Sequence, residues 1–291
     1  MTSSITVYGE ALVDLVPAGA GPLAPLTPVL GGGPFNVARA LGRLGADVAF
    51  QSRLSDDAFG IALRDSLAAD GVDLSHCLTG KEPTTLSVAS LDTDGTATYT
   101  FYVDGTADRL AEPVPVSGGY AVFGTLSLAL EPASLRYAKA VRQSADAGAV
   151  VCLDPNIRPA FASEKHRLFL RDLLESVTVL KLSDEEVEFL GDTSHVPVVV
   201  TTLGGGGIRV RAPFGTAEVQ APQVEVADTI GAGDTVMAAL VHQFDARGLD
   251  RCALLDLGAE QWHEILDFAA RAAAVTVSRT GADTPYLHEL A

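Results

Sequence analysis

Short hydrophobic runs alternate along the chain with longer segments whose apolar residues recur at helical spacing. Runs rich in Val, Ile and Leu predict buried strands, and segments rich in Ala and Leu predict helices. Because continuous apolar strands separated by helices form βαβ units, the pattern predicts an α/β fold with a mostly parallel sheet covered on both faces. The predicted strands are Ile5–Tyr8, Ala121–Phe123, Val150–Leu153, Val177–Lys181 and Val198–Thr202, and the predicted helices are Asn36–Leu44, Ala58–Ala69, Pro132–Ala147, Thr235–Arg247 and Glu260–Val277.

Two segments interrupt this alternation. Ala11–Leu30 follows the first strand without a helix, and Thr84–Tyr102 alternates polar and apolar residues around Asp94-Gly95, which predicts a β-hairpin. Neither segment has an obvious helix to cover it. We therefore expect one domain over residues 1–291 with a small β-sheet lid contributed by about residues 11–30 and 84–105. An exposed lid has an unpaired strand edge and an uncovered apolar face, which predicts a lid-to-lid homodimer.

The composition is that of a globular protein with a strong acidic balance. Hydrophobic residues make up 47% of the 291 residues and charged residues 20%, so the chain can bury a sizeable core. The 37 acidic and 20 basic residues give a net charge of −17 at pH 7. Because such a field repels phosphate backbones and anionic lipid surfaces, nucleic acid and membrane partners are not expected.

Cysteine usage and the N-terminus point to a cytoplasmic protein with reduced thiols. The N-terminal residues lack a basic segment and read as a strand rather than a signal peptide. No run of about 18 uncharged apolar residues is present to cross a bilayer. The cysteines are far apart and form no metal-binding or disulfide pattern: Cys77, Cys152 and Cys252.

A turn of small residues lies between a predicted strand, Val224–Val226, and the predicted helix that begins at Thr235. A strand, a small-residue turn and a helix together point free backbone N–H groups at an anion, and glycine lets the backbone approach it closely. The amides of Gly231, Ala232 and Gly233 are therefore candidates to stabilise a phosphoryl group in transfer.

Asp234 stands at the start of that helix. The helix dipole stabilises an ionised carboxylate there, and such a carboxylate can accept the proton of an attacking hydroxyl. The alternative is that Asp234 only caps the helix and the glycines only form the turn.

Two strings resemble the signatures of the ribokinase-like (PfkB) carbohydrate kinases. Asp228–Asp234 (DTIGAGD) is similar to the family's C-terminal signature, and Gly31–Gly45 (GGGPFNVARALGRLG) is similar to its N-terminal signature. They occur in the family's order, and the resemblance covers essentially the whole chain. It implies a three-layer α/β/α sandwich with a β lid, and transfer of the γ-phosphoryl group of ATP, with Mg²⁺, to a sugar hydroxyl.

The resemblance places several residues against the sugar. Asp14 offers two acceptor oxygens suited to vicinal hydroxyls, although it could also be a turn or surface residue. Gly32 and Gly33 let the backbone approach a ligand, and Asn36 offers an amide while also reading as a helix N-cap. Arg158, the only cation in its loop, is suited to a phosphate or a substrate oxygen, or to a surface salt bridge.

Phe101 ends the predicted hairpin and could pack on the apolar face of a sugar or fill the inner face of the lid. Asp154 and Asn156 belong to a DPN-x-R string that lies near the transferring phosphate in the family, where they would organise Mg²⁺ or its waters. The family usually has Asn-x-x-Glu where this chain has Ser183 and Glu186. Glu186 would then support the Mg²⁺ network.

The nucleotide side is also implied by the resemblance. Because Ser183 replaces the usual Asn, Lys181 is a substitute phosphate contact. A monovalent cation, potassium, would be held by Asp228, the Ile230 carbonyl and Gly281. No GxGxxG string follows the first strand and no GxxxxGK[ST] string occurs, so a dinucleotide site and a Walker-A loop are not expected. The nucleotide candidates are Lys181, Ser183, Glu186, Thr202, Gly204, Gly207, Gly231, Gly233 and Ala273.

Three strings resemble those of bacterial fructokinases, namely Phe123–Leu128, Ala107-Asp108 and Asp154–Arg158. The expected reaction is therefore conversion of D-fructose to fructose 6-phosphate. Many fructokinases carry an Arg where this chain has Val103-Asp104, which is a departure from their pattern.

The alternatives are other sugars or a protein without catalysis. Gly33 stands where fructose-1-phosphate-type members carry a Lys, so that phosphate clamp is missing. Members acting on 2-keto-3-deoxygluconate usually carry Tyr-Arg after the hairpin, and Asp104 in this segment would repel a carboxylate. That sugar acid and ribose stay open as substrates, as does a catalytically silent sugar sensor on the same fold.

Overall fold

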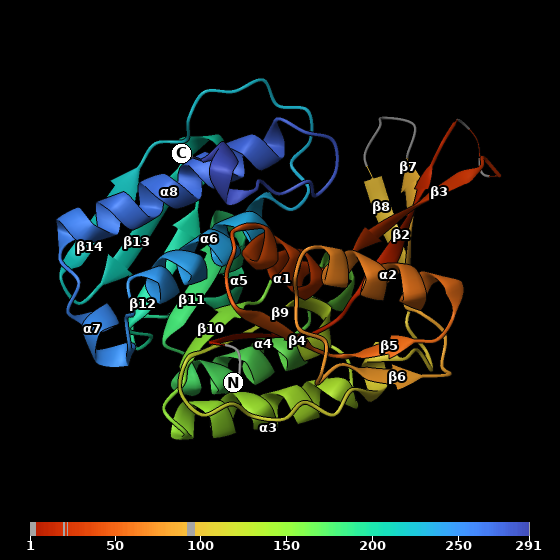
Figure 1. The fold of residues 1–291 in the computed structure, drawn as a ribbon, viewed down its shortest axis with the longest axis horizontal. Coiled ribbons are helices and arrows are strands. Elements are labelled where there is room, and N and C mark those ends of the chain that lie inside the picture. Colours follow the sequence, from red (N-terminus) through yellow and green to blue (C-terminus); the bar gives the residue numbers. More distant parts are fainter. Residues whose placement is uncertain (1–3, 20, 22, 92–96, 291) are drawn as a thin grey trace.

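A central twisted sheet with helices on both faces forms the body of the molecule (Figure 1). The computed structural model describes residues 4–19, 21, 23–91 and 97–290. The strand order is β14-β13-β12-β11-β10-β9-β1-β4; the strands from β12 to β4 are parallel, and β13 pairs antiparallel with both β12 and the edge strand β14. The strands are β1 (Ile5–Tyr8), β4 (Val48–Gln51), β9 (Tyr120–Gly124), β10 (Val150–Asp154), β11 (Val179–Ser183), β12 (Val198–Thr202), β13 (Ile208–Ala212) and β14 (Gly215–Val219).

Successive strand residues point to opposite faces, and each face has its own core. In β10, Val150 and Cys152 enter one hydrophobic cluster, whereas Val151 and Leu153 enter the other. The first cluster lies under α1 (Gly33–Arg43), α6 (Ala232–Ala246) and α8 (Ala259–Val277). The second lies under α3 (Ala133–Asp146), α4 (Glu164–Leu173) and α5 (Asp184–Leu190). The predicted three-layer α/β/α sandwich is therefore confirmed.

The remaining elements lie around this sandwich. Helix α2 (Ala58–Ala69) packs beside the small parallel pair β5 (Arg53–Ser55) and β6 (Leu78–Gly80), and α7 (Arg251–Leu255) precedes α8. In the part of the chain that the structure describes, no helix combines the length and hydrophobicity needed to cross a bilayer.

A second, four-stranded sheet, which we call the lid, projects from the body (Figure 1). Its order is β3-β2-β7-β8, with β2 parallel to β7 and the outer pairs antiparallel. The Asp94-Gly95 turn of the predicted hairpin lies outside the described residues. The lid strands are β2 (Leu12–Pro17), β3 (Leu26–Gly31), β7 (Leu86–Leu91) and β8 (Ala97–Tyr102).

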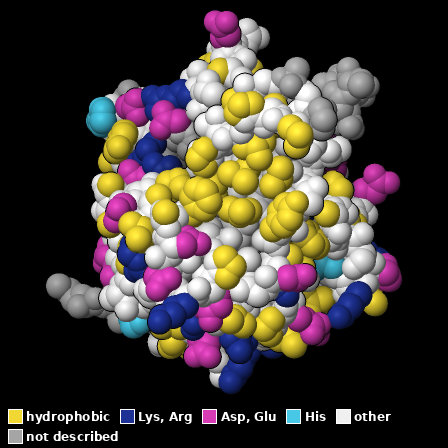
Figure 2. Space-filling view, turned by 90° about the vertical axis from the view of Figure 1, so that its right-hand side faces the viewer, with side chains coloured by type: hydrophobic (Ala, Val, Ile, Leu, Met, Phe, Trp, Pro, Cys, Tyr) yellow, Lys and Arg dark blue, Asp and Glu magenta, His cyan; other side chains and the backbone are white. Residues whose placement is uncertain are grey.

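The lid leaves large apolar side chains uncovered. Figure 2 shows hydrophobic side chains gathered on the side of the molecule from which the lid projects. An exposed apolar area on a small sheet is typical of an interaction surface. The large side chains that the lid strands expose include Val16, Leu26, Val29, Tyr99 and Tyr102.

Two local predictions are wrong. Val224–Val226 is not a strand: Val224 and Val226 are exposed, and the following amides of Ala227 and Asp228 donate to the carbonyl of Val277, so α8 rather than the sheet holds this segment. Asn36 is not an N-cap, because α1 already begins at Gly33 with Gly32 as its cap. Proline lacks an N–H, which the first turn does not need, and so Pro34 allows this early start.

Candidate active site

The parallel strands end at one edge of the sheet, where loops and helix N-termini collect functional side chains. Asp154 is the last residue of β10, and Thr125 follows the end of β9. Lys181 lies in β11, and the N-terminus of α6 carries Asp234. The sequence-predicted catalytic turn therefore lies beside the ends of the central strands.

Asp234 is buried and is held by α1. It is the third residue of α6 and is 6% exposed, and Asn36 Nδ2 donates a 2.8 Å hydrogen bond to its Oδ2. Its side chain caps no helix amide, so the capping alternative fails. Burial raises the pKa of Asp234, whereas the Asn36 hydrogen bond and the charges of Lys181 and Arg158 partly offset that rise. A carboxylate with a raised pKa is a stronger general base.

The turn before α6 offers free amides. Gly231 has φ 78°, a left-handed conformation that glycine adopts without strain. Among the described residues, the amides of Gly231, Gly233 and Asp234 have no protein acceptor, whereas the amide of Ala232 donates to Thr229 O at 3.3 Å. Free amides at a helix N-terminus can bind an anion. The Ala232 amide is therefore a weaker candidate to bind a phosphoryl group than the amides of Gly231 and Gly233.

Lys181 brings a positive charge directly to this turn. Its Nζ forms a 2.6 Å ion pair with Asp154 Oδ2, and both side chains are buried. A side chain at Gly233 would place its Cβ 2.9 Å from the same Nζ, so glycine lets the ammonium reach the turn. Burial lowers the pKa of Lys181, and the carboxylates of Asp154, Glu186 and Asp234 raise it to a net value above normal. The ammonium therefore stays charged.

The carboxylates of Asp154, Glu186 and Asp234 surround the single ammonium of Lys181. Burial, together with the Glu186 and Asp234 carboxylates, raises the pKa of Asp154 to about 7, although Lys181 opposes the rise. Asp154 Oδ1 is buried without a hydrogen-bond partner among the described residues. It is thus an acceptor that a bound donor or a cation could satisfy.

Ser183 and Glu186 form a capping box at the start of α5. Ser183 Oγ accepts from the Glu186 amide at 3.3 Å, and Glu186 Oε2 accepts from the Ser183 amide at 2.8 Å. Glu186 Oε1 accepts from the Ile157 amide at 2.6 Å. Glu186 therefore ties the Asp154–Arg158 loop to α5. Nucleotide contact by Ser183, and Mg²⁺ support by Glu186, stay predictions.

The lid presents a row of side chains to the body. The strand register pairs Asp14 with Ser87 and Ser87 with Phe101, which places all three on one face. Burial raises the pKa of Asp14, and the Ser87 hydroxyl and the Arg158 charge partly lower it. The Phe101 ring lies 5.3 Å from that of Phe161, so the lid contacts the loop that follows Arg158.

Arg158 is exposed and, within the described ranges, forms no ion pair. It lowers the pKa of both Asp14 and Asp234, so its charge acts on the two predicted sugar-side carboxylates together. The surface salt bridge that we considered for Arg158 is absent from the described part of the chain. A free guanidinium at this place is suited to an anionic group.

The predicted nucleotide positions follow β12 and α8. Thr202 ends β12, and its Oγ1 donates to Leu182 O at 3.3 Å. Gly204 faces open space, whereas a Cβ at Gly207 would lie 2.0 Å from Val219 O, so the fold itself requires this glycine. Ala273 lies on α8, which packs against α6.

The predicted cation loops meet through Asp228. Its Oδ1 accepts from the Ile230 amide at 3.0 Å, and its Oδ2 accepts from the Gly281 amide at 2.9 Å. A Cβ at Gly231 would lie 2.7 Å from the Cβ of Ala282, so the C-terminal loop packs on the turn before α6. The potassium assignment stays a prediction.

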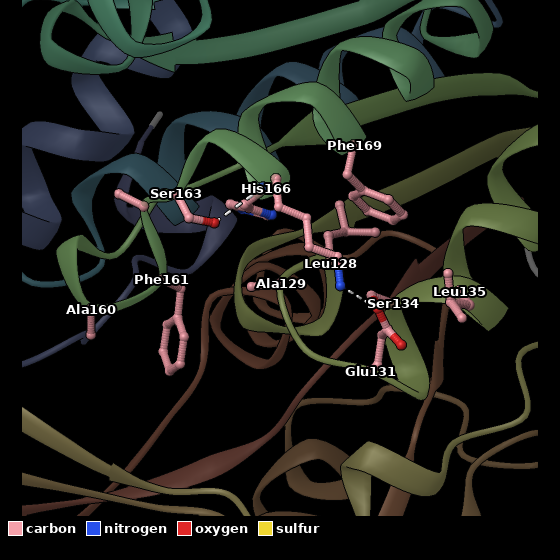
Figure 3. Close-up of a pocket in the computed structure, with 12 residues that line it drawn as sticks. Leu128, Ala129, Glu131, Ser134, Leu135, Ala160, Phe161, Ser163, His166 and Phe169 are labelled. Carbon is pink, nitrogen blue, oxygen red and sulfur yellow. Dashed lines mark hydrogen bonds and ion pairs between the residues drawn. The ribbon is translucent and has the colours of Figure 1, made fainter.

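A cavity lies beside this site rather than in it. It measures about 270 Å³ and opens between the start of α3 and the loop before α4, with His166 and Phe169 on one wall (Figure 3). None of the predicted site residues lines it. Phe161 borders it and also contacts Phe101 of the lid.

Sequence reasoning missed Ser87 and Thr125. Ser87 shares a face with Asp14 only because β2 pairs with β7, and the alternating pattern of the hairpin could have indicated that face. Thr125 stands out by a backbone φ of 62°, which no sequence pattern shows for a β-branched residue.

Comparison with known proteins identifies the family of this chain. A profile described as "pfkB family carbohydrate kinase" matches residues 2–289. A fructokinase of Rhizobium leguminosarum bv. trifolii is 34% identical over 260 residues, which are 81% of this chain and 78% of that protein.

Solved structures of fructokinases share the fold. A Xylella fastidiosa fructokinase with bound ATP superimposes with a TM-score of 0.90 at 27% identity, over 100% of this chain and 97% of that one. A Vibrio cholerae O395 fructokinase with fructose, ADP and calcium ion gives 0.84 at 26% identity, over 99% and 98%.

Proposed function

The chain belongs to the pfkB family of carbohydrate kinases, and from that premise we propose that it transfers the γ-phosphoryl group of ATP to D-fructose. The observation that carries the proposal is the buried Asp234 carboxylate, positioned by Asn36 beside free amides at the start of α6. The fructokinase relatives, which include structures with ATP, ADP and fructose, support the donor and the acceptor. The proposed product is fructose 6-phosphate.

Asp234 acts as the general base in this proposal. Its Oδ1, which Asn36 leaves free, takes the proton of the acceptor hydroxyl. The hydroxyl oxygen forms a bond to the γ-phosphorus while the bond between that phosphorus and the ADP oxygen breaks. The amides of Gly231 and Gly233, with the Lys181 ammonium beneath them, stabilise the negative charge on the moving group. The Arg158 guanidinium adds positive charge on the side of the phosphoryl group that faces the lid.

The sugar lies between the lid and the body. Asp14 binds its hydroxyls, Phe101 packs on its apolar face, and Gly32 and Gly33 let the chain approach it. Contact between Phe101 and Phe161 closes the lid onto the body and excludes water, which protects ATP from hydrolysis.

The polar groups at the sheet edge fit a metal-bound nucleotide. The unpartnered Asp154 Oδ1 and the free amides suit water-shelled Mg²⁺ and phosphates. Within the described ranges no cluster of three or more metal-binding side chains occurs. When bound, Mg²⁺ neutralises phosphate charge. A potassium ion at Asp228, Ile230 and Gly281 would hold the turn before α6.

We propose a homodimer through the lid, since its strands expose several large apolar side chains. Replacing Val16 with Lys would then shift the protein toward the monomer in sedimentation, whereas Leu135→Lys, an exposed residue of α3, would not. A wild-type monomer at micromolar concentration would refute the dimer.

A coupled assay of ADP release with fructose, ribose and 2-keto-3-deoxygluconate tests the proposed function. Fructose should give the highest kcat/KM. Preference for another sugar would refute the substrate, and sugar binding without ADP release would favour a sensor. Asp234→Asn should lower kcat by roughly 10²–10⁴ with little change in ATP affinity. Asp146→Asn, an exposed carboxylate on α3, is the matched control.

A further inference from the structure

Three polar side chains converge on one point in front of Gly33. A Cβ built on Gly33 would lie 2.4 Å from Thr125 Oγ1, 3.3 Å from Asp234 Oδ1 and 3.4 Å from Asn156 Nδ2. Among the described residues, none of these three atoms has a hydrogen-bond partner of its own. A cavity of about 10 Å³ lies beside this point, and Gly33, Thr125 and Asp234 border it together with core residues such as Val37 and Phe123.

The backbone at two of these residues is strained. Thr125 has φ 62° and Asn156 has φ 42°, and they are the only non-glycine residues with positive φ in the part of the chain that the structure describes. Asparagine tolerates this region, but a β-branched residue there is an outlier. Both follow the ends of neighbouring strands, β9 and β10. Strain of this kind persists where the surrounding structure enforces it, and it concentrates at active sites.

The three atoms match the hydrogen-bonding needs of one hydroxyl group. A hydroxyl donates one hydrogen bond and accepts two. Asp234 Oδ1 can only accept when ionised, Asn156 Nδ2 can only donate, and Thr125 Oγ1 can donate. A hydroxyl at this point is therefore satisfied completely, with its proton directed at the carboxylate. When that proton moves to Asp234, the electron pair of the O–H bond becomes free to form the bond to phosphorus.

We propose that Thr125 is a catalytic residue that holds the acceptor hydroxyl of the sugar against Asp234, with Asn156 as the second donor. The inference rests on the proposed kinase function, although not on the identity of the sugar. It assigns Asn156 to the sugar hydroxyl rather than to the waters of Mg²⁺. It also explains why position 33 must be glycine, because a methyl group there would fill the space of the hydroxyl.

Three substitutions at Thr125 test the proposal. Thr125→Val keeps the branched shape and removes the hydroxyl, so kcat/KM for the sugar should fall about 10- to 100-fold, as for loss of a hydrogen bond to a reacting group. Thr125→Ser keeps the hydroxyl and should stay within about threefold of wild type. Thr125→Gly should lose activity like Thr125→Val but should raise Tm, because glycine relieves the positive φ. Thr216→Val, at an exposed threonine of β14, is the control.

Opposite changes in stability and activity are the decisive result, because a residue with a purely structural role would lose both together. Turnover of Thr125→Val within twofold of wild type would overturn the proposal, as would a lower Tm for Thr125→Gly. The series is run with whichever sugar the wild type phosphorylates. Should the wild type phosphorylate none, the kinase proposal fails by itself. Calorimetry of sugar binding without ATP then decides: weaker binding by Thr125→Val supports the contact, and unchanged binding refutes it.

Discussion

Replacing Glu10 with Gln should flatten the dependence of stability on pH between about pH 5 and 8. Glu10 follows β1 and is fully buried, and its Oε2 accepts hydrogen bonds from the amide and hydroxyl of Ser127. Its Oε1 has no partner within the described ranges. Burial is the main cause that raises the pKa of Glu10 from 4.5 to about 7, and the Ser127 hydrogen bonds oppose the rise.

The sign follows from the direction of the shift. Because the folded protein holds the Glu10 proton more tightly than the unfolded chain, this contribution to stability is complete below about pH 4.5 and is lost as pH rises through about 7. A shift of about 2.5 pKa units corresponds to about 3 kcal/mol, of which most is lost between pH 5 and 8.

Urea unfolding of wild type and Glu10→Gln at pH 5 and pH 8 measures this effect. The free energy of unfolding of the wild type should fall by about 2–3 kcal/mol more than that of the variant. A constant cost of glutamine cancels in this comparison. Glu225→Gln, an exposed carboxylate in the segment after β14, should retain the wild-type slope. Equal slopes for wild type and Glu10→Gln would show that burial does not hold the Glu10 proton.

Three further outcomes test the site. Gly33→Ala should lower kcat at least 100-fold in a protein that still folds by circular dichroism, because the added methyl group meets Thr125 Oγ1. The control Gly205→Ala, whose methyl group would lie in open space, should stay active, and an active Gly33→Ala would contradict the crowding at position 33. Asp14→Asn should raise the sugar KM about 10-fold, and an unchanged KM would exclude sugar contact. Lys181→Met should destabilise by about 3–5 kcal/mol in urea unfolding, because it leaves Asp154 unpaired. Adding Asp154→Leu should restore stability but not turnover, and no recovery of stability would refute the pairing.

The sequence predicted the body of the fold well because that body depends on periodic burial. Strands such as Ile5–Tyr8 and Val198–Thr202 contain no charged residue and are largely buried, as a sheet covered on both faces requires. The segment Val224–Val226 is also rich in valine, although Glu225 lies at its centre, and it has no strand to pair with; β-branched residues favour a strand only where a neighbour is present. The antiparallel edge pair β13 and β14 was missed because its outer residues are charged or exposed.

The proposed catalytic turn and the proposed sugar-side residues could be identified as candidates because each is part of a local string. Asp234, Gly231 and Gly233 come from one string, and Asn36 and Gly33 come from another. Neither string shows which of its residues contact residues of the other. The Asn36–Asp234 hydrogen bond joins residues 198 positions apart, and the Lys181–Asp154 ion pair joins neighbouring strands. Only the packing of α1 on α6, and of β11 on β10, creates those contacts.

Thr125 differs from these cases because its residue type argues against its conformation. A threonine at φ 62° contradicts local preference, and local preference is what sequence reasoning uses. Chains that fold reliably satisfy such preferences nearly everywhere, and the exceptions collect where function requires a fixed side-chain position. Glycine would give the same turn without strain, but it would supply no hydroxyl in front of Gly33. The cost of the strained backbone is therefore best explained by the contact that the Thr125 hydroxyl makes with the substrate.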